Sequence, residues 1–370
     1  MLIRRFLILA LLTQNPVDLY NSARADMEAG RWAEAAKKYE QAIREDPTHI
    51  PTLFNLAVCY TRLGERKRAT ELYLELLKRD AGVFEARINL ALLLEESGDF
   101  RGAAEQTEQA IALRPNDADL YAMAASLLEA AEEFDRARDR LLAAEAKGLR
   151  TAQIYAALSD AELRRKDEVK SREYLEKAAE LDPTNRRIQR QLGVAYARAG
   201  DYNRAAAALK PLLPETAPEL AEVYFSSKNY PEAAELFREL TQREPGNAEY
   251  FFMLGRSHME LKQLAPAAAA LRKAVELRTD FVEAYGALGS VLAVQEDWTG
   301  AAAVLGKFLE LRPGVAGSHF LLAISLDRLG NAKEALYHYN KFLEIDRGAD
   351  DVRSFQARQR IKALEERLKR

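Results

Sequence analysis

The chain has few of the side chains that carry redox, metal or nucleophilic chemistry. Its 370 residues include one cysteine and four histidines. A single cysteine excludes an internal disulfide, and Cys59 lies in an apolar stretch that favours a buried, unreactive thiol. The histidines are scattered without metal-ligand spacing, at His49, His258, His319 and His338. We therefore expect neither a disulfide framework nor a metal site.

Phosphate-binding and catalytic motifs are also missing. The sequence contains no Gly-x-x-x-x-Gly-Lys-Ser/Thr loop, no dinucleotide-binding glycine fingerprint and no nucleophile elbow. Its charge is balanced, with 54 basic and 57 acidic residues and a formal net charge of −3. This balance gives no global attraction to nucleic acid. These absences predict a protein that is not an enzyme, with no catalytic residues, no cofactor, no small-molecule substrate and no nucleic-acid partner.

Long hydrophobic runs are absent too, apart from one short segment near the N-terminus. Arg4 and Arg5 precede an apolar run over residues 6–12, which is the order found in a secretory signal peptide. The run is too short to span a bilayer as a helix. We expect residues 1–14 to direct export from a bacterial cytoplasm, to the periplasm or the medium. The alternative is an uncleaved segment on a protein that stays in the cytoplasm or at the inner membrane.

What the chain does have is a period. Six grid points lie 34 residues apart, and they are occupied by Gly30, Gly64, Gly98, Glu132, Lys166 and Gly200. A small residue follows each grid point by five positions, and the same spacing resumes after a deletion of six residues. A period of this length predicts a solenoid in which each unit packs on its neighbours. Apolar residues at helical spacing flank each grid point, so each unit is expected to be a helix–turn–helix hairpin.

The motif within each unit resembles the tetratricopeptide repeat (TPR). It reads Leu-Ala/Gly-x-x-Tyr, Gly-x-aromatic, Ala, aromatic, Ala, Pro, and covers about ten units over residues 15–346. The resemblance implies an all-α, right-handed superhelical solenoid. A small residue in the first helix is needed because a larger one would push the two helices of the hairpin apart. Every unit has one, as Ala23, Ala57, Ala91, Ala125, Ser159, Gly193, Ala221, Gly255, Gly289 and Ala323.

We divide the chain into four segments on this basis. TPR units 1–6 take residues 15–213 and units 7–10 take residues 214–346. The N-terminal segment 1–14 precedes them, and a basic amphipathic helix over 347–370 follows as a cap for the exposed end of the solenoid. The residues expected on the buried face of this cap are Val352, Phe355, Ile361, Leu364 and Leu368.

The boundary between the two blocks of repeats follows from a shortened unit. An alanine run ends at Leu209, and the prolines Pro211, Pro214 and Pro218 come directly after it. Because proline interrupts a helix, the second helix of unit six is expected to lose more than one turn. We interpret this joint as a hinge. The alternative is a deletion that neighbouring packing absorbs.

The resemblance also implies where a ligand would bind. In the TPR family the first helices of successive hairpins line a concave groove that binds peptides or helices of other proteins. The corresponding positions here carry aromatic, aliphatic and arginine side chains, which are typical of binding hot spots. An N-terminal cluster contains Tyr20, Phe54, Val58, Ile88 and Leu92, and a C-terminal cluster contains Phe225, Phe252, Met259, Phe320 and Ile324. The arginines beside them are Arg24, Arg62, Arg190, Arg198 and Arg256.

These positions define the functional prediction. We expect a non-catalytic scaffold or adaptor that binds a peptide or helical segment with apolar anchors and some acidic character. For each cluster, packing against a neighbouring first helix is the alternative to ligand contact. A carboxylate clamp of the kind found in chaperone-binding TPR domains is disfavoured, because only Asn55 matches its pattern. The rival function is a structural subunit that assembles through its edges or with itself and has no groove ligand.

Overall fold

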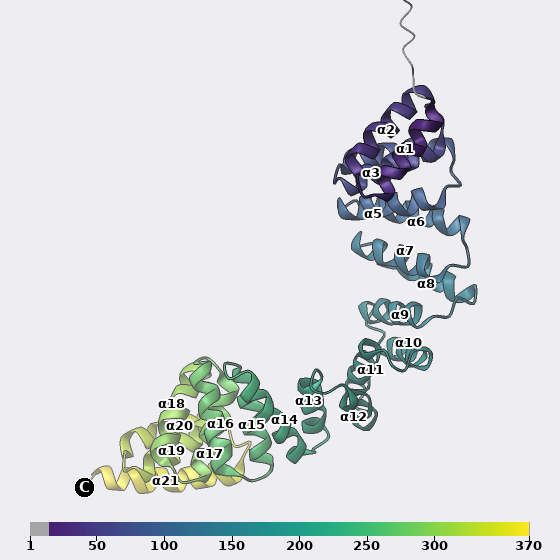
Figure 1. The fold of residues 1–370 in the computed structure, drawn as a ribbon. Helices are drawn as coiled ribbons and strands as arrows, with labels where there is room; N and C mark the ends of the chain where they lie inside the picture. The colour runs from purple at the N-terminus through teal and green to yellow at the C-terminus, as the bar shows by residue number, and fades with distance from the viewer. Residues whose placement is uncertain (1–14, 370) are drawn as a thin grey trace, which may run out of the picture. The chain divides into compact units, whose positions relative to one another are not determined.

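The computed structural model describes residues 15–369, and the predicted signal segment 1–14 lies outside them. The described residues form two compact units, one up to Ile188 and the other from Gln189, and each is treated by itself. Within both units helices follow one another as antiparallel hairpins and no strand occurs among residues 15–369, as Figure 1 shows. The predicted all-α solenoid of hairpins is therefore confirmed.

The first unit contains five complete hairpins. Their helices are α1 (Pro16–Glu28) with α2 (Trp32–Glu45), α3 (Ile50–Arg62) with α4 (Arg66–Arg79), α5 (Phe84–Glu96) with α6 (Phe100–Leu113), α7 (Ala118–Ala130) with α8 (Phe134–Ala146), and α9 (Ala152–Arg164) with α10 (Glu168–Leu181).

The second unit continues the same pattern. The first residues of α11 belong to the first unit. The elements are α11 (Arg186–Arg198) with α12 (Tyr202–Leu209) and the 3₁₀ turn η1 (Lys210–Leu212), α13 (Ala217–Ser226) with α14 (Tyr230–Arg243), α15 (Ala248–Glu260) with α16 (Leu264–Leu277), α17 (Val282–Val294) with α18 (Trp298–Leu311), α19 (Ala316–Arg328) with α20 (Ala332–Asp346), and α21 (Asp351–Lys369).

The residue at each grid point turns the chain by adopting a left-handed backbone. The glycines at these turns have φ from +74° to +84°. Five turns achieve nearly the same conformation without glycine, with φ from +59° to +63°, at Glu132, Lys166, Lys228, Lys262 and Glu296. Glycine reaches this region without steric cost, whereas an L side chain is strained there. The 34-residue grid therefore reflects a backbone requirement rather than a requirement for glycine itself.

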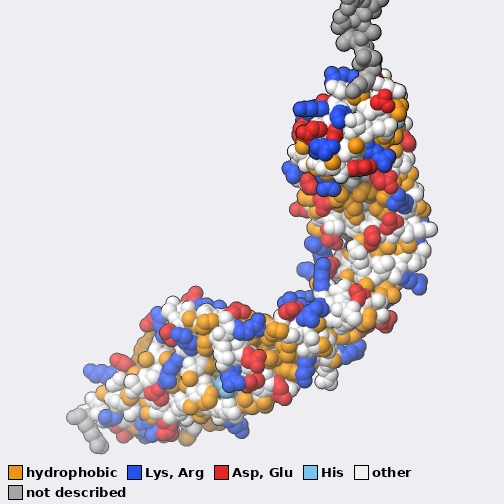
Figure 2. Space-filling model, in the orientation of Figure 1, with side chains coloured by type: hydrophobic (Ala, Val, Ile, Leu, Met, Phe, Trp, Pro, Cys, Tyr) orange, Lys and Arg blue, Asp and Glu red, His pale blue; other side chains and the backbone are white. Residues whose placement is uncertain are grey.

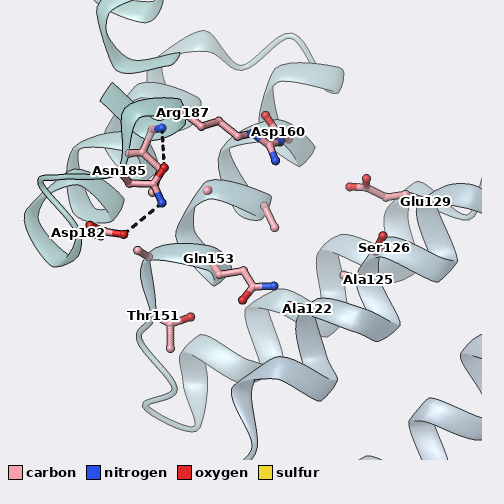
Figure 3. Close-up of a pocket in the computed structure, with 14 residues that line it drawn as sticks. Ala122, Ala125, Ser126, Glu129, Thr151, Gln153, Asp160, Asp182, Asn185 and Arg187 are labelled. Carbon is pink, nitrogen blue, oxygen red and sulfur yellow. Dashed lines mark hydrogen bonds and ion pairs between the residues drawn. The ribbon is translucent and has the colours of Figure 1, made fainter. Parts of the chain in front are cut away.

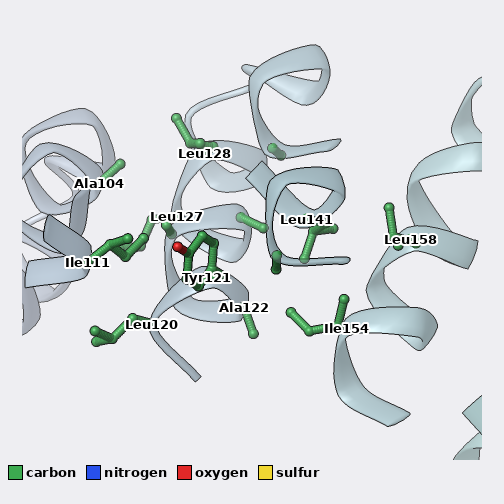
Figure 4. Close-up of a cluster of buried hydrophobic side chains, with 14 of the residues drawn as sticks. Ala104, Ile111, Leu120, Tyr121, Ala122, Leu127, Leu128, Leu141, Ile154 and Leu158 are labelled. Carbon is green, nitrogen blue, oxygen red and sulfur yellow. The ribbon is translucent and has the colours of Figure 1, made fainter. Parts of the chain in front are cut away.

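Close approach of the two helices explains the small residue in each first helix. A Cβ built on Gly255 would lie 2.6 Å from Leu271 Cγ, and one on Gly289 would lie 2.5 Å from Leu305 Cδ2. In the fifth hairpin, the Oγ atoms of Ser159 and Ser171 lie 2.8 Å apart and share a hydrogen bond. Within the first unit one buried cluster extends over several hairpins, and Figure 4 shows its side chains from α6 to α9.

The shortened unit has the expected short helix. Helix α12 has 8 residues, whereas α10 and α14 have 14 each, so the predicted loss of more than one turn is confirmed. The turn that follows is fixed by the Thr216 hydroxyl, which donates a hydrogen bond of 2.7 Å to the carbonyl oxygen of Leu209. The role of this joint as a hinge stays a prediction.

The C-terminal helix α21 packs on the last hairpin by a different face from the one predicted. Its buried residues are Ser354, Ala357 and Leu364, and Ile361 is half-buried beside them. The assignment of Val352, Phe355 and Leu368 to the buried face is wrong, since their exposed fractions are 68%, 63% and 43%. Ser354, Ala357 and Leu364 are spaced so that they lie on one face of the helix. Because two of the three are small, α21 can lie close to α20.

Candidate functional site

The predicted ligand-binding positions lie on the first helices of the hairpins. We call this surface the first-helix face and define it by the fifth and ninth residues of each such helix. In the first unit these are Tyr20 and Arg24, Phe54 and Val58, Ile88 and Leu92, Ala122 and Ser126, and Ala156 and Asp160. In the second unit they include Arg190 and Val194, Phe252 and Arg256, Gly286 and Ser290, and Phe320 and Ile324.

The side chains of the N-terminal cluster are anchored in the core and exposed in part. Tyr20, Phe54 and Val58 are half-buried against the core of the first hairpins, whereas Leu92 is 44% exposed. Asn55 donates hydrogen bonds from Nδ2 to the Tyr39 hydroxyl (3.1 Å) and to the Tyr20 hydroxyl (3.3 Å). Asn55 on α3 therefore links that helix to α1 and α2, and these bonds explain the presence of asparagine here without a carboxylate clamp.

The C-terminal cluster differs in burial from one residue to the next. Phe320 is 5% exposed and its ring packs 5.0 Å from that of Phe342, so it belongs mainly to the core. Phe252 is half-buried with its ring 4.8 Å from that of Phe281, and Met259 packs against the same core. Ile324 lines a cavity of about 590 Å³ between α19, α20 and α21.

Most of the predicted arginines already have partners within the chain. Arg24 pairs with Glu28 at 2.9 Å, and Arg190 Nε donates to Glu219 Oε1 at 2.9 Å. The Arg256 guanidinium lies 4.6 Å from the ring centre of Phe225. Arg198 is exposed at the end of α11. Two of the five predicted arginines, Arg24 and Arg190, thus already pair with carboxylates of the chain itself, which weakens the case for an acidic ligand at those two positions.

Arg62 takes part in a contact that recurs along the solenoid. Its guanidinium lies 5.7 Å from the ring centre of Trp32, the aromatic residue after the turn of the preceding hairpin. Arg164 lies over Phe134 at 4.8 Å in the same way, and Arg328 over Trp298 at 5.6 Å. Cation–π contacts of this kind help to hold successive hairpins together.

One concavity of the first-helix face lies where no site residue was predicted. A cavity of about 670 Å³ lies between α7, α9 and the start of α11, and Figure 3 shows its lining. We call it the alanine hollow. Small side chains form its floor: Ala122, Ala125, Ala152, Ala156 and Ala157. Polar side chains surround them, together with the apolar Ile188: Ser126, Glu129, Thr151, Gln153, Asp160, Asp182, Asn185 and Arg187.

The sequence contains a signal for this hollow. The fifth residue of a first helix is Tyr20, Phe54 or Ile88 in the first three hairpins, but alanine in the next two, at Ala122 and Ala156. Loss of a large side chain from two consecutive positions of one surface leaves a space that neighbouring residues do not fill. The feature that distinguishes this site in the sequence is small side chains where neighbouring hairpins have large ones.

The rim of the hollow carries a carboxylate that the protein does not neutralise well. Glu129 lies at the C-terminal end of α7, where the helix dipole disfavours a negative charge. Its closest cation is Arg164, whose nitrogen lies 3.8 Å from Glu129 Oε2. Among the described residues no hydrogen bond to the carboxylate of Glu129 occurs. Burial raises the pKa of Glu129, Arg164 partly opposes this effect, and Asp160 adds to it.

The other rim charges are balanced to different degrees. Arg187 lies 3.6 Å from Asp160, and Asn185 donates a hydrogen bond of 3.1 Å to Asp182. Hydrogen bonds from Asn185 and Thr184 lower the pKa of Asp182, which therefore stays ionised.

In the second unit, burial and then the neighbouring Glu219 and Glu249 raise the pKa of Glu222 on α13.

One histidine pair forms a further titratable group, on the last hairpin. His319 Nε2 lies 3.0 Å from the Pro313 carbonyl oxygen, which can only accept, so this nitrogen carries the proton. His319 Nδ1 therefore accepts a hydrogen bond of 2.9 Å from Nδ1 of His338. Burial, and then the neighbouring His319, lower the pKa of His338 to about 4.

Within the described part of the chain, no group of His, Cys, Asp or Glu side chains gathers as metal ligands would. Nor do the helices of residues 15–369 include one with the length and apolarity needed to cross a membrane. On the face that Figure 2 shows, basic and acidic side chains are interspersed over both units.

The repeated hairpins and the left-handed residue at each turn define a helical repeat protein. Two family models match the chain, and both are described as tetratricopeptide repeat. One matches residues 26–93 and 163–224, and the other residues 121–186, 219–280 and 287–350. The chain therefore belongs to the tetratricopeptide repeat family, and the resemblance inferred from the motif is confirmed.

Two curated relatives are similar to parts of the chain. The peroxisomal targeting signal receptor of Candida albicans is 24% identical over 291 residues, which cover 74% of this chain and 48% of the receptor. A tetratricopeptide repeat and J domain-containing co-chaperone of Fusarium oxysporum is 34% identical over 89 residues, or 24% of this chain and 17% of that protein. The chain thus spans about half the length of the first relative and much less of the second.

A solved structure supports the fold. The C-terminal part of a TPR repeat-containing protein from Cytophaga hutchinsonii matches with a TM-score of 0.52 and 15% identity. The match covers 64% of this chain and 99% of that structure. At this identity the likeness concerns the arrangement of helices and leaves the ligand open.

Proposed function

We propose that this protein is a non-catalytic scaffold or adaptor whose first-helix face binds peptide or helical segments of partner proteins. The observation that carries the proposal is the partial exposure of Phe54, Leu92 and Phe252 on side chains that the core holds in place. Apolar groups that are pre-positioned in this way bind at low entropic cost and are typical of hot spots. The relative that is named a targeting signal receptor supports a role in recognising other proteins.

The test is a cross-linking pull-down from the native host with the wild type and a Phe54→Asp/Phe252→Asp variant. The matched control is Leu74→Asp, which places the same charge on an exposed side chain of a second helix, α4. Circular dichroism first verifies that each variant is folded. We expect partners to be lost from the first-helix variant and retained by the control. Retention of all partners by both variants would contradict the proposal.

Assembly through the C-terminal edge is the second candidate function. It is favoured by the exposed Val352 and Phe355 on α21, and Phe355 lines the 590 Å³ cavity beside α19. An exposed apolar pair next to a cavity suits contact with another protein surface. Light scattering coupled to gel filtration tests this: a Val352→Ser/Phe355→Ser variant should lower the molar mass if the wild type self-associates through this edge.

Export is also proposed, from the arginine pair and the apolar run in residues 1–14. Cell fractionation and N-terminal sequencing of the mature protein test it. Removal of the segment from a protein found outside the cytoplasm would support export. An intact N-terminus in the cytoplasmic fraction would overturn it.

A further inference from the structure

We infer that the alanine hollow is an anchor pocket for a lysine or arginine side chain on a segment of a partner protein. The inference rests on the proposed function and adds the chemistry of the ligand at one place on the first-helix face. It replaces the acidic character expected from the sequence with a basic anchor at this position. Three observations support it: the volume of the hollow, the arrangement of apolar and polar groups in its lining, and the lack of a hydrogen bond to the carboxylate of Glu129 among the described residues.

The space suits one long side chain together with the backbone that presents it. The hollow has a volume of about 670 Å³, within the usual range of ligand pockets. It exists because Ala122 and Ala156 occupy the position that Tyr20, Phe54 and Ile88 occupy in the three preceding hairpins. Helices α7 and α9 are uninterrupted along this stretch, so the hollow has helical walls rather than loops on these two sides.

The lining separates apolar from polar surface in the way that a long cationic side chain requires. Methyl groups of Ala122, Ala156 and Ala157 form the floor, against which the methylene stem of lysine or arginine would pack. Ser126 and Gln153 line the same space, and Figure 3 shows Gln153 directed into it. These groups offer hydrogen-bond acceptors to an ammonium or guanidinium group.

The charge of the rim selects a cation over an anion. Five charged residues face the hollow or border it. Three are the carboxylates Glu129, Asp160 and Asp182, and two are the cations Arg187 and Arg164. Arg187 lies beside Asp160, and the Arg164 guanidinium stacks on Phe134, which leaves the carboxylate of Glu129 without a hydrogen bond among the described residues.

Glu129 is therefore the group that a ligand would satisfy. A cation in the hollow would give this carboxylate the charge-assisted hydrogen bond that it lacks, in a partly desolvated place where such bonds are strong. It would also offset the unfavourable position of Glu129 at the C-terminal end of α7. A ligand carboxylate at the same position would meet like charge and would be excluded.

The experiment begins with selection of random dodecapeptides displayed on phage against the full-length protein. Counter-selection uses the Ala156→Phe variant, which fills the hollow without adding charge. Phenylalanine is compatible with the fold there, because Phe54, Phe252 and Phe320 occupy the same register position in other hairpins. Peptides that bind the wild type and fail on Ala156→Phe are expected to be enriched in lysine or arginine at one position.

The affinity of a selected peptide is then measured by fluorescence anisotropy. Neutralising its anchor, arginine to citrulline or lysine to acetyl-lysine, is expected to weaken binding to the wild type at least tenfold. The Glu129→Gln variant should bind both forms of the peptide with similar, weak affinity. The control Glu105→Gln removes an equal charge from an exposed position on α6 and should behave as wild type.

Two results would overturn the inference. One is that no peptide distinguishes the wild type from Ala156→Phe. The other is that the neutralised peptide binds the wild type as well as the charged one does. Failure here is distinct from failure of the proposed function, which is judged by the pull-down with Phe54→Asp/Phe252→Asp. Partners lost in that variant but retained by Glu129→Gln would leave a scaffold whose anchors are apolar only.

Discussion

The contact between the two helices of a hairpin predicts a specific coupling between Gly255 and Leu271. A Cβ on Gly255 would lie 2.6 Å from Leu271 Cγ, 2.9 Å from its Cδ2 and 3.3 Å from the Ala267 carbonyl oxygen. Carbon atoms in contact normally lie about 3.5–4.0 Å apart, so Leu271 would have to move by about 1 Å. We therefore expect Gly255→Ala to be destabilising although alanine is the better helix former.

The expected magnitude is a difference between two effects. Overpacking a close contact costs about 1–3 kcal/mol, and replacing a helical glycine by alanine gains about 1 kcal/mol. The net change in the free energy of unfolding is a loss of up to about 2 kcal/mol. In α18, Gly306 supplies the matched control, because a Cβ there meets no atom within 4 Å. Gly306→Ala should therefore raise stability by about 1 kcal/mol.

The chain itself suggests how to relieve the strain. Ala57 occupies the position of Gly255 in the second hairpin, and Tyr73 occupies that of Leu271. A flat ring lies beside the methyl group in that hairpin, whereas Leu271 as placed would have its Cγ 2.6 Å from the added Cβ. Gly255→Ala combined with Leu271→Tyr should thus be less destabilising than the sum of the single changes, with a coupling of about 1 kcal/mol.

Urea unfolding followed by circular dichroism, with hydrogen exchange of peptides from α15 and α16, measures this cycle. Exchange is needed because a repeat protein can unfold in parts, and a single midpoint then averages over its units. Additive effects to within about 0.5 kcal/mol would refute the reasoning. So would a stabilising Gly255→Ala, because it would mean that the helices separate freely at this contact.

Three further predictions follow from the turns, the histidine pair and the cap. Lys262→Gly, at a left-handed turn with φ +59°, should stabilise by about 0.5–1 kcal/mol, whereas Lys37→Gly inside α2 should destabilise by about 1 kcal/mol; urea unfolding measures both. Because burial lowers the pKa of His338 to about 4, its neutral form is favoured by folding. This contribution to stability is complete above pH 6.5 and declines as the pH falls toward 4, so the urea midpoint should fall more between pH 7 and 5 for wild type than for His338→Asn. Arg360→Ala removes two hydrogen bonds of 2.8 and 2.9 Å to the buried carboxylate of Asp327 and should lower the free energy of unfolding by about 1.5–3 kcal/mol. The loss should appear as faster hydrogen exchange in α21. Unchanged exchange there would mean that packing alone holds this helix on the last hairpin.

The fold could be predicted from the sequence because one geometric requirement repeats. Where Glu132 and Lys166 interrupt the glycine pattern, the spacing still marks the turn, and the structure gives both residues a left-handed backbone. The buried face of the C-terminal helix α21 could not be predicted in the same way, because the apolar residues Val352 and Phe355 have helical spacing but are exposed. Small residues such as Ala357 make the contact with the last hairpin, and a pattern of large apolar residues does not predict their burial.

The candidate site could be predicted only in outline, for a related reason. The register identifies which residues lie on the first-helix face, but their availability depends on partners far away in sequence. Arg190 illustrates this, since its carboxylate partner, Glu219, is 29 residues away and on another helix. No pattern within one hairpin reports such a pair, so the arginines could be placed on the face but their engagement could not be foreseen.

The register also suggests how one scaffold separates stability from recognition. The eighth residue of each first helix other than the shorter α13 is small, because it meets the second helix of its own hairpin, and in α13 the corresponding residue is Ala221. The fifth residue lies beside this contact, with the Phe54 ring 6.0 Å from that of Tyr73, yet its side chain varies from Tyr20 through Ile88 to Ala156 and Arg190. Substitutions at the fifth position change the height and charge of the first-helix face while leaving the close approach at the eighth residue in place. The alanine hollow then results from small residues at two successive fifth positions, with the hairpin backbone unchanged. A different ligand specificity would require only other side chains at the fifth positions.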